Sequence, residues 1–203
     1  MTLLALLRHG ETDWSGRGRI QGRTDTSLNA SGRAALQAVT LPVAHAGMQV
    51  VSSPLQRCLQ TAEMLGLAPV AVEPRLAEME WGAWEGRSLQ ELREQLGEAM
   101  VRNEARGFDF RPESGESPRD VLQRVSPWLA EVAAAGRPTL AISHRGVIRV
   151  VFARALGWDM RGKPPAKLRW DALHLFRLDA AGVPCVEALN LPLPPRGLQG
   201  EGA

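Results

Sequence analysis

The sequence is poor in cysteine and contains no long apolar run. Its two cysteines, Cys58 and Cys185, do not make a disulfide framework, and their spacing offers no zinc site. The N-terminal apolar run spans only about six residues, stops at Arg8 and follows no basic segment, so it does not fit a signal peptide. No segment approaches the apolar length of a membrane span. These absences predict a cytoplasmic protein with no membrane partner.

Excess charge is also small. The formal net charge is +2, which is too little to argue for a nucleic-acid partner, and no basic patch is interleaved with aromatic residues as in single-strand binders. The basic residues are nevertheless unevenly distributed along the chain, because the segment from residue 145 to residue 169 contains seven of them and only one acid, Asp159. This run is either a solvated face or a field that attracts an anionic substrate. Its basic residues are Arg145, Arg149, Arg154, Arg161, Lys163, Lys167 and Arg169.

Length and composition favour a single globular domain. The chain has 203 residues, of which 44% are hydrophobic and 23% charged, so it can bury one sizeable core but is marginal for two domains. We expect the domain to span residues 1–191. Residues 192–203 are rich in proline and glycine, and we expect this tail to be loosely ordered.

Short apolar runs alternate with helical patterns along the chain. The predicted helices occupy 30–46, 54–66 and 147–156, and two more begin at the capping residues Ser88 and Ser117. This alternation predicts an α/β fold, namely a three-layer α/β/α sandwich with a mainly parallel central sheet. The predicted strands are 2–8, 49–53, 70–73 and 138–143, followed by a terminal hairpin of 172–178 and 183–189.

A cation and an imidazole follow the first predicted strand. The apolar run ends in Arg8-His9-Gly10-Glu11-Thr12, and α/β sheets bind ligands in the crevice beyond the carboxyl ends of their strands. The loop that follows interleaves glycine with arginine, which brings backbone N–H groups and positive charge near an anion. Imidazole attacks phosphorus when an acceptor such as a backbone carbonyl holds its other nitrogen, so His9 is a candidate nucleophile.

Further polar residues lie near the other predicted strand ends. Arg57 lies in the first turn after the second strand, where a helix N-terminus also favours anions. Glu78 and Glu80 are both candidate acids, because sequence alone does not measure their distance from the site. His144 follows the strand that ends at residue 143, which repeats the layout of His9.

The spacing of these residues resembles the histidine phosphatase superfamily, the phosphoglycerate mutase-like phosphatases. Four elements occur in the family's order between residues 2 and 156. The resemblance implies the α/β/α fold of that family and an enzyme with no cofactor and no metal site. The elements are Arg8-His9-Gly10-Glu11-Thr12 followed by Gln21-Gly22, then Ser53-x-x-x-Arg57-x-x-x-Thr61-Ala62, then Leu76-x-Glu78, and finally the second histidine, His144.

The resemblance assigns a role to each motif residue. His9 becomes phosphorylated, and Arg8, Arg57 and His144 bind the phosphoryl oxygens. Glu78 corresponds to the acid that protonates the leaving oxygen and then activates water. Guanidinium groups suit phosphoryl binding because their planar fork can hold two oxygens at once.

Other residues near the motifs are expected to contact the substrate. Gln21 and Gly22 belong to the loop of the first motif, and Trp81 either walls the pocket or packs in the core. Two positions depart from the family pattern. Ser15 stands where asparagine is common and reaches less far, and Arg145 stands where glycine usually follows the second histidine. We expect Arg145 to add a cation that contacts the substrate.

The predicted function is a metal-independent phosphatase that hydrolyses a small-molecule phosphate monoester through a phosphohistidine. Two alternatives remain open at this stage. One is a phosphoglycerate mutase, which uses the same chemistry and is longer in this family. The other is a catalytically weak phosphate-binding or interaction module. The sequence selects neither a particular phosphorylated substrate nor an oligomeric state.

Overall fold

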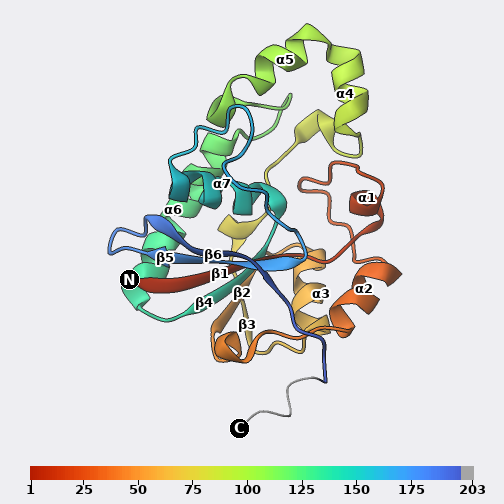
Figure 1. Ribbon diagram of the computed structural model, residues 1–203. Helices are drawn as coiled ribbons and strands as arrows, with labels where there is room; N and C mark the ends of the chain where they lie inside the picture. The colour runs from red at the N-terminus through yellow and green to blue at the C-terminus, as the bar shows by residue number, and fades with distance from the viewer. Residues whose placement is uncertain (198–203) are drawn as a thin grey trace.

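The computed structural model describes residues 1–197, and at its centre lies one six-stranded sheet flanked by helices (Figure 1). The strand order is β3-β2-β4-β1-β5-β6. The first four strands are parallel, whereas β5 runs antiparallel to β1 and β6 antiparallel to β5. This confirms the mainly parallel three-layer fold. The strands are β1 (Thr2–Arg8), β2 (Gln49–Ser52), β3 (Val70–Val72), β4 (Thr139–Ser143), β5 (Ala172–Leu178) and β6 (Pro184–Pro192).

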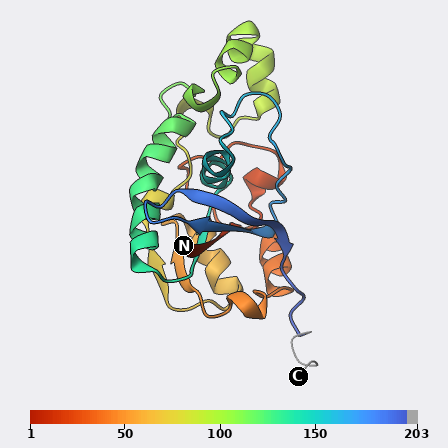
Figure 2. The same ribbon diagram turned by 60° about the vertical axis from the view of Figure 1, so that its left-hand side comes forward.

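Helices cover both faces of the sheet (Figures 1 and 2). α6 and α7 pack on one face and α2 and α3 on the other, while α4 and α5 project beyond the sheet. None of the described helices has the length and apolar character needed to cross a membrane. The helices are α1 (Asp13–Gly16), α2 (Ala30–Gln37), α3 (Gln56–Met64), α4 (Leu89–Leu96), α5 (Glu98–Glu104), α6 (Pro118–Ala135) and α7 (Arg145–Leu156).

Strand β1 is buried on both faces, which explains its unbroken apolar sequence. Leu4 and Leu6 belong to the core shared with α6 and α7, whereas Ala5 and Leu7 belong to the core shared with α2. Side chains alternate across a strand, so a strand between two helical layers needs apolar residues at every position.

The sheet register brings the strand ends of the predicted site together. β1 pairs with β4 so that Arg8 lies opposite Ser143. The residues that follow, His9 and His144, therefore emerge side by side at one edge of the sheet. β2 ends next to them at Ser52, on the other side of β4. The parallel sheet thus converts motifs that are far apart in sequence into one site.

The helix predicted over 30–46 is wrong in extent. α2 covers only its first half, and a separate 3₁₀ turn follows at Val43–His45. Pro42 prevents a continuous helix, since proline lacks an N–H donor and disfavours helical geometry in the residue before it.

The predicted boundaries of the other helices and strands agree with the observed ones to within a few residues. α3 begins at Gln56 and not at Pro54, and α7 begins directly after His144. The helices predicted from Ser88 and Ser117 begin there, each with a complete capping box. The terminal hairpin is also confirmed.

The tail predicted from residue 192 is described as far as residue 197. The Thr40 N–H donates to the Pro194 carbonyl at 2.9 Å, and the Arg196 N–H donates to the Ala38 carbonyl at 2.8 Å. These bonds hold the first part of the tail against the segment after α2. The rest of the predicted tail, 198–203, lies outside the described residues.

Close packing of α2 under the loop after β1 requires Gly32. A Cβ at this position would stand 2.7 Å from the backbone nitrogen of Glu11, two residues beyond His9. We predict that Gly32→Ala lowers the free energy of unfolding by about 1–3 kcal/mol, because backbone must shift to make room. Urea denaturation measures this. The exposed neighbour provides the control: Ser31→Ala should change stability by less than about 0.5 kcal/mol. Wild-type stability in Gly32→Ala would contradict the close approach.

Candidate active site

The imidazole of His9 lies one residue beyond β1 and is buried, with 4% of its surface exposed. Its Nδ1 is 2.7 Å from the carbonyl oxygen of Gly10. Because a carbonyl only accepts, Nδ1 carries the hydrogen and Nε2 keeps a lone pair. Burial, followed by the charges of Arg8 and Arg57, holds the pKa of His9 well below its usual value of 6.5. The ring is therefore neutral and nucleophilic at neutral pH.

Arg8 and Arg57 are among the arginines that line the cavity with His9. Arg57, fully buried on α3, donates from Nη1 to the Thr24 carbonyl at 2.9 Å and from Nη2 to the Gly22 carbonyl at 2.8 Å. The Nε atoms of Arg8 and Arg57 are buried and have no hydrogen-bond partner among the described residues. Burial lowers the pKa of both groups, but arginine stays protonated in proteins. The cavity therefore holds positive charge and donors that an oxyanion satisfies.

The loop that carries Gly22 is held by Glu85, a residue that the sequence analysis missed. The Glu85 carboxylate accepts from the backbone N–H groups of Arg23 at 2.8 Å and Thr24 at 2.9 Å. Gly22 has a φ of +55° and lies so close to this carboxylate that a Cβ would overlap it. Glu85 thereby fixes the carbonyl groups that Arg57 binds.

Glu78 is the acid at the cavity. Its buried carboxylate accepts from the N–H of Met79 at 2.8 Å and from the N–H of Gly146, in the first turn of α7, at 3.0 Å. A Cβ at Gly146 would overlap this carboxylate. Glu80 is exposed and does not line the cavity. The fold thus distinguishes the two candidate acids, because Glu78 lines the cavity and Glu80 does not.

Arg124 on α6 anchors the segment that carries Glu78. Its guanidinium donates to the carbonyl oxygens of Arg75, of Ala77 at 2.7 Å and of Glu78 at 3.2 Å. It also forms an ion pair with Glu116 at 2.9 Å. The sequence analysis missed Arg124, because an arginine inside a helix is usually a solvated residue and no local motif marks this one.

His144 lies behind His9 and not in the cavity wall. It is fully buried, and its ring centroid is 5.2 Å from that of His9. Its Nε2 lies 2.7 Å from the Ser53 hydroxyl and 3.4 Å from the Cys58 sulfur. Burial, followed by the charge of Arg57, holds its pKa well below 6.5, so this ring is also neutral. Its predicted contact with phosphoryl oxygens stays a prediction.

The cavity at the strand ends has a volume of about 210 Å³. Every predicted site residue except His144 lines it. Six further lining residues were not predicted as site residues, namely Gly18, Arg19, Ile20, Leu89, Gly146 and Arg149. The predicted residues in the wall are Arg8, His9, Ser15, Gln21, Gly22, Arg57, Glu78, Trp81 and Arg145.

Part of the basic run between residues 145 and 169 lies at the cavity, where it can attract an anion, and part lies on the solvated surface. Arg145 and Arg149, one turn apart on α7, reach the cavity. Farther along, Arg169 pairs with Asp171 at the surface. Among the described residues, no group of three or more histidine, cysteine or acidic side chains is arranged to hold a metal ion.

Two polar residues of the first loop offer hydrogen bonds to a ligand. The Ser15 hydroxyl takes part in the capping box of α1 with Thr12. The amide oxygen of Gln21 accepts from the hydroxyls of Thr12 at 2.8 Å and Thr26 at 2.6 Å. The amide nitrogen of Gln21 is thus the group it can offer to a ligand.

Known proteins resemble this chain over most of its length. The family described as histidine phosphatase superfamily (branch 1) matches residues 4–188. The chain is 34% identical over 176 residues to glucosyl-3-phosphoglycerate phosphatase from Mycolicibacterium vanbaalenii, covering 79% of this chain and 77% of the relative. It is 30% identical over 191 residues to 2,3-bisphosphoglycerate-dependent phosphoglycerate mutase from Methylobacterium radiotolerans, covering 88% and 90%. The expectation that mutases are longer fails for this relative, because nearly all of it aligns.

A solved structure shares the architecture. Phosphoserine phosphatase from Entamoeba histolytica, in complex with 3-phosphoglyceric acid, superposes with a TM-score of 0.78 and 26% identity, covering 94% of this chain and 97% of the other. The fold, the order of the four motifs and the family match agree. This chain therefore belongs to branch 1 of the histidine phosphatase superfamily and is a phosphatase of that superfamily.

Proposed function

We propose that this chain hydrolyses a small-molecule phosphate monoester through a phosphohistidine on His9, without a metal ion. One observation carries the proposal. A neutral imidazole lies beside the guanidinium groups of Arg8, which is half-buried, and Arg57, which is fully buried, and the buried Nε atoms of both have no partner among the described residues. This is a nucleophile next to donors for the oxygens of its target.

The first step transfers the phosphoryl group to the enzyme. Nε2 of His9 bonds to phosphorus while the bond from phosphorus to the ester oxygen breaks. Arg8 and Arg57 neutralise charge on the phosphoryl oxygens, which is most of what a protein contributes to a loose phosphoryl-transfer transition state. Glu78 donates its proton to the leaving oxygen. We also assign His144, which packs on His9, to phosphoryl binding.

The second step transfers the phosphoryl group to water. The Glu78 carboxylate takes a proton from a water molecule whose oxygen attacks phosphorus, and the phosphorus–nitrogen bond to His9 breaks. Inorganic phosphate leaves, and Glu78 is protonated again. We also propose that five further residues contact the substrate, because they lie in the cavity wall. They are Ser15, Gln21, Gly22, Trp81 and Arg145.

Mutase activity is the second candidate, favoured by the 30% identity to a mutase. The two functions share the phosphohistidine and differ in the acceptor, which is a second substrate hydroxyl in a mutase and water in a phosphatase. Product analysis with 3-phosphoglycerate separates them. Our proposal expects inorganic phosphate and no isomer.

Replacing the nucleophile should abolish turnover. His9→Ala should lower kcat by on the order of 10⁴-fold or more, because no other group forms the intermediate. Rapid mixing of wild type with ³²P-labelled substrate, followed by alkaline detergent quench, should trap label on His9 that is stable to base and lost in acid. His45 lies outside the cavity, so His45→Gln is the control. This variant should keep both turnover and the base-stable label on His9. Activity should persist in excess EDTA. Label on another residue, or turnover in His9→Ala, would overturn the mechanism.

The acid role predicts a dependence on the leaving group. Glu78→Gln should slow hydrolysis of alkyl phosphates by about 10²–10⁴-fold, because an alkoxide needs a proton to leave. Formation of the phosphoenzyme from p-nitrophenyl phosphate, whose leaving group departs as a stable anion, should slow much less. Glu80→Gln is the matched control, and single-turnover kinetics make the comparison. A larger alkyl-specific loss in Glu80→Gln would transfer the acid role to Glu80.

A further inference from the structure

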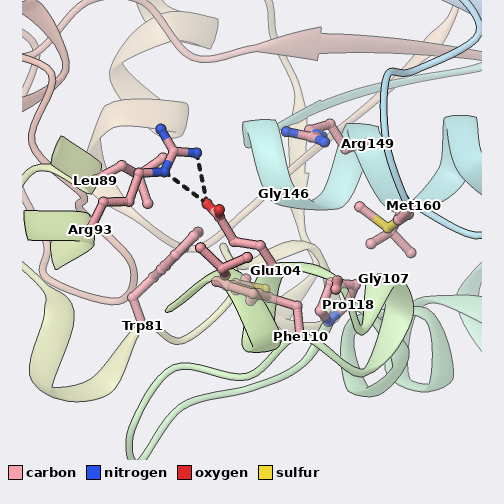
Figure 3. Close-up of a pocket in the computed structure, with 15 residues that line it drawn as sticks. Trp81, Leu89, Arg93, Glu104, Gly107, Phe110, Pro118, Gly146, Arg149 and Met160 are labelled. Atoms are coloured by element: carbon pink, nitrogen blue, oxygen red, sulfur yellow. Dashed lines mark hydrogen bonds and ion pairs between the residues drawn. The ribbon is translucent and has the colours of Figure 1, made fainter. Parts of the chain in front are cut away.

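A second cavity, of about 510 Å³, opens beside the phosphoryl site (Figure 3). It lies under the projecting helices α4 and α5 and against α7. The two cavities share part of their walls, because Trp81, Leu89, Gly146 and Arg149 line both. A group esterified to a phosphate held by Arg8 and Arg57 therefore has an adjoining space to occupy. We call this second cavity the outer chamber.

The lining of the outer chamber is mainly apolar. Trp81 meets the edge of Phe110 with ring centroids 5.7 Å apart, which makes a rigid aromatic wall. Met160 lies on the opposite side (Figure 3). Val101 on α5 is 65% exposed and lines the same chamber, so an apolar side chain is presented to the space and not packed in a core.

The charged residues of the chamber offer little to a polar leaving group. Arg93 and Glu104 neutralise each other through an ion pair of 2.7 Å, drawn in Figure 3, which also ties α4 to α5. Arg149 stands where the two cavities meet, and its guanidinium lies 5.7 Å from the Trp158 ring. No hydrogen bond or ion pair joins the Arg149 guanidinium to the described residues, so its charge is available at the phosphoryl end.

We infer that the outer chamber is the leaving-group subsite and selects phosphate monoesters with an apolar leaving group, aliphatic or aromatic. This inference rests on the proposed function. The outer chamber has the size of an ordinary small-molecule pocket, about 300–1,000 Å³. Such pockets bind the apolar part of a ligand through walls of hydrophobic and aromatic side chains, as found here. The preference differs from that of the relatives named above, whose printed substrates, phosphoserine and glucosyl-3-phosphoglycerate, have polar leaving groups.

A series of n-alkyl phosphates tests the inference, because chain length changes apolar area while the leaving alkoxide stays chemically alike. From propyl to hexyl phosphate, kcat/KM should rise about 4-fold per methylene, the value of burying one such group. Val101→Asp should flatten this rise by placing a carboxylate in the chamber. Val43→Asp, at a 70% exposed position outside both cavities, is the matched control and should keep it.

Binding of n-alkyl phosphonates by calorimetry gives the same test without turnover. Hexylphosphonate should bind more tightly than propylphosphonate in wild type, and Val101→Asp should remove the difference. Affinities independent of chain length, or an unchanged slope in Val101→Asp, would overturn the subsite while hydrolysis through His9 stood. Retained hydrolysis in His9→Ala would overturn the proposed function and leave the binding slope untouched.

Discussion

Unpaired positive charge at the carboxyl ends of β1 and β2 is the constraint on which the rest of the site depends. Arg8 ends β1, and Arg57 follows β2 on α3, each with a buried Nε that has no partner in the described part of the chain. A buried donor without a partner typically costs about 1–3 kcal/mol, and more in a charged group. The fold keeps this cost because the donors are then ready for an anion and need not reorganise during the reaction.

The same charges set the protonation state of His9, the proposed nucleophile. Burial and the charges of Arg8 and Arg57 disfavour the second proton that would make the His9 ring a cation. The Gly10 carbonyl holds the one hydrogen of the neutral ring on Nδ1. In the proposed mechanism, one arrangement thus attracts the phosphoryl group and leaves Nε2 free to attack it. Glu78, the proposed acid, is oriented independently, through the N-terminus of α7 and through Arg124. The proposed chemistry at the two ends of the scissile bond therefore comes from different parts of the fold.

The sequence predicts much of the site because each motif follows a short apolar run. A parallel sheet aligns the ends of such runs, so placing Arg8, His9 and Arg57 at one cavity needs no knowledge of distance, whereas the choice of Glu78 over Glu80 needs the fold. Residues that act through the fold leave no such trace. Glu85 and Arg124 contact segments about 60 and 50 residues away along the chain, and each looks like a surface residue locally.

Some predictions fail for equally physical reasons. The long helix after residue 30 is cut by Pro42, and the backbone before it bonds to the C-terminal segment, which no local pattern reveals. His144 follows its strand as predicted and packs on His9, which the register of β4 against β1 sets, and its contact with phosphoryl oxygens stays a prediction. The outer chamber depends on where α4 and α5 project, which the hydrophobic pattern of these helices does not encode.

Imidazole ¹⁵N NMR of the ligand-free protein tests the central claim most directly. The His9 resonances, assigned by their loss in His9→Gln, should show a neutral ring with hydrogen on Nδ1 at pH 7.5 and still at pH 6.5, where an ordinary histidine is half protonated. A hydrogen on Nε2 would contradict the account, because His9 would then lack the free electron pair on which the proposed phosphohistidine depends. A titration midpoint near 6.5 would contradict it as well, because burial and the charges of Arg8 and Arg57 would then not act on the ring.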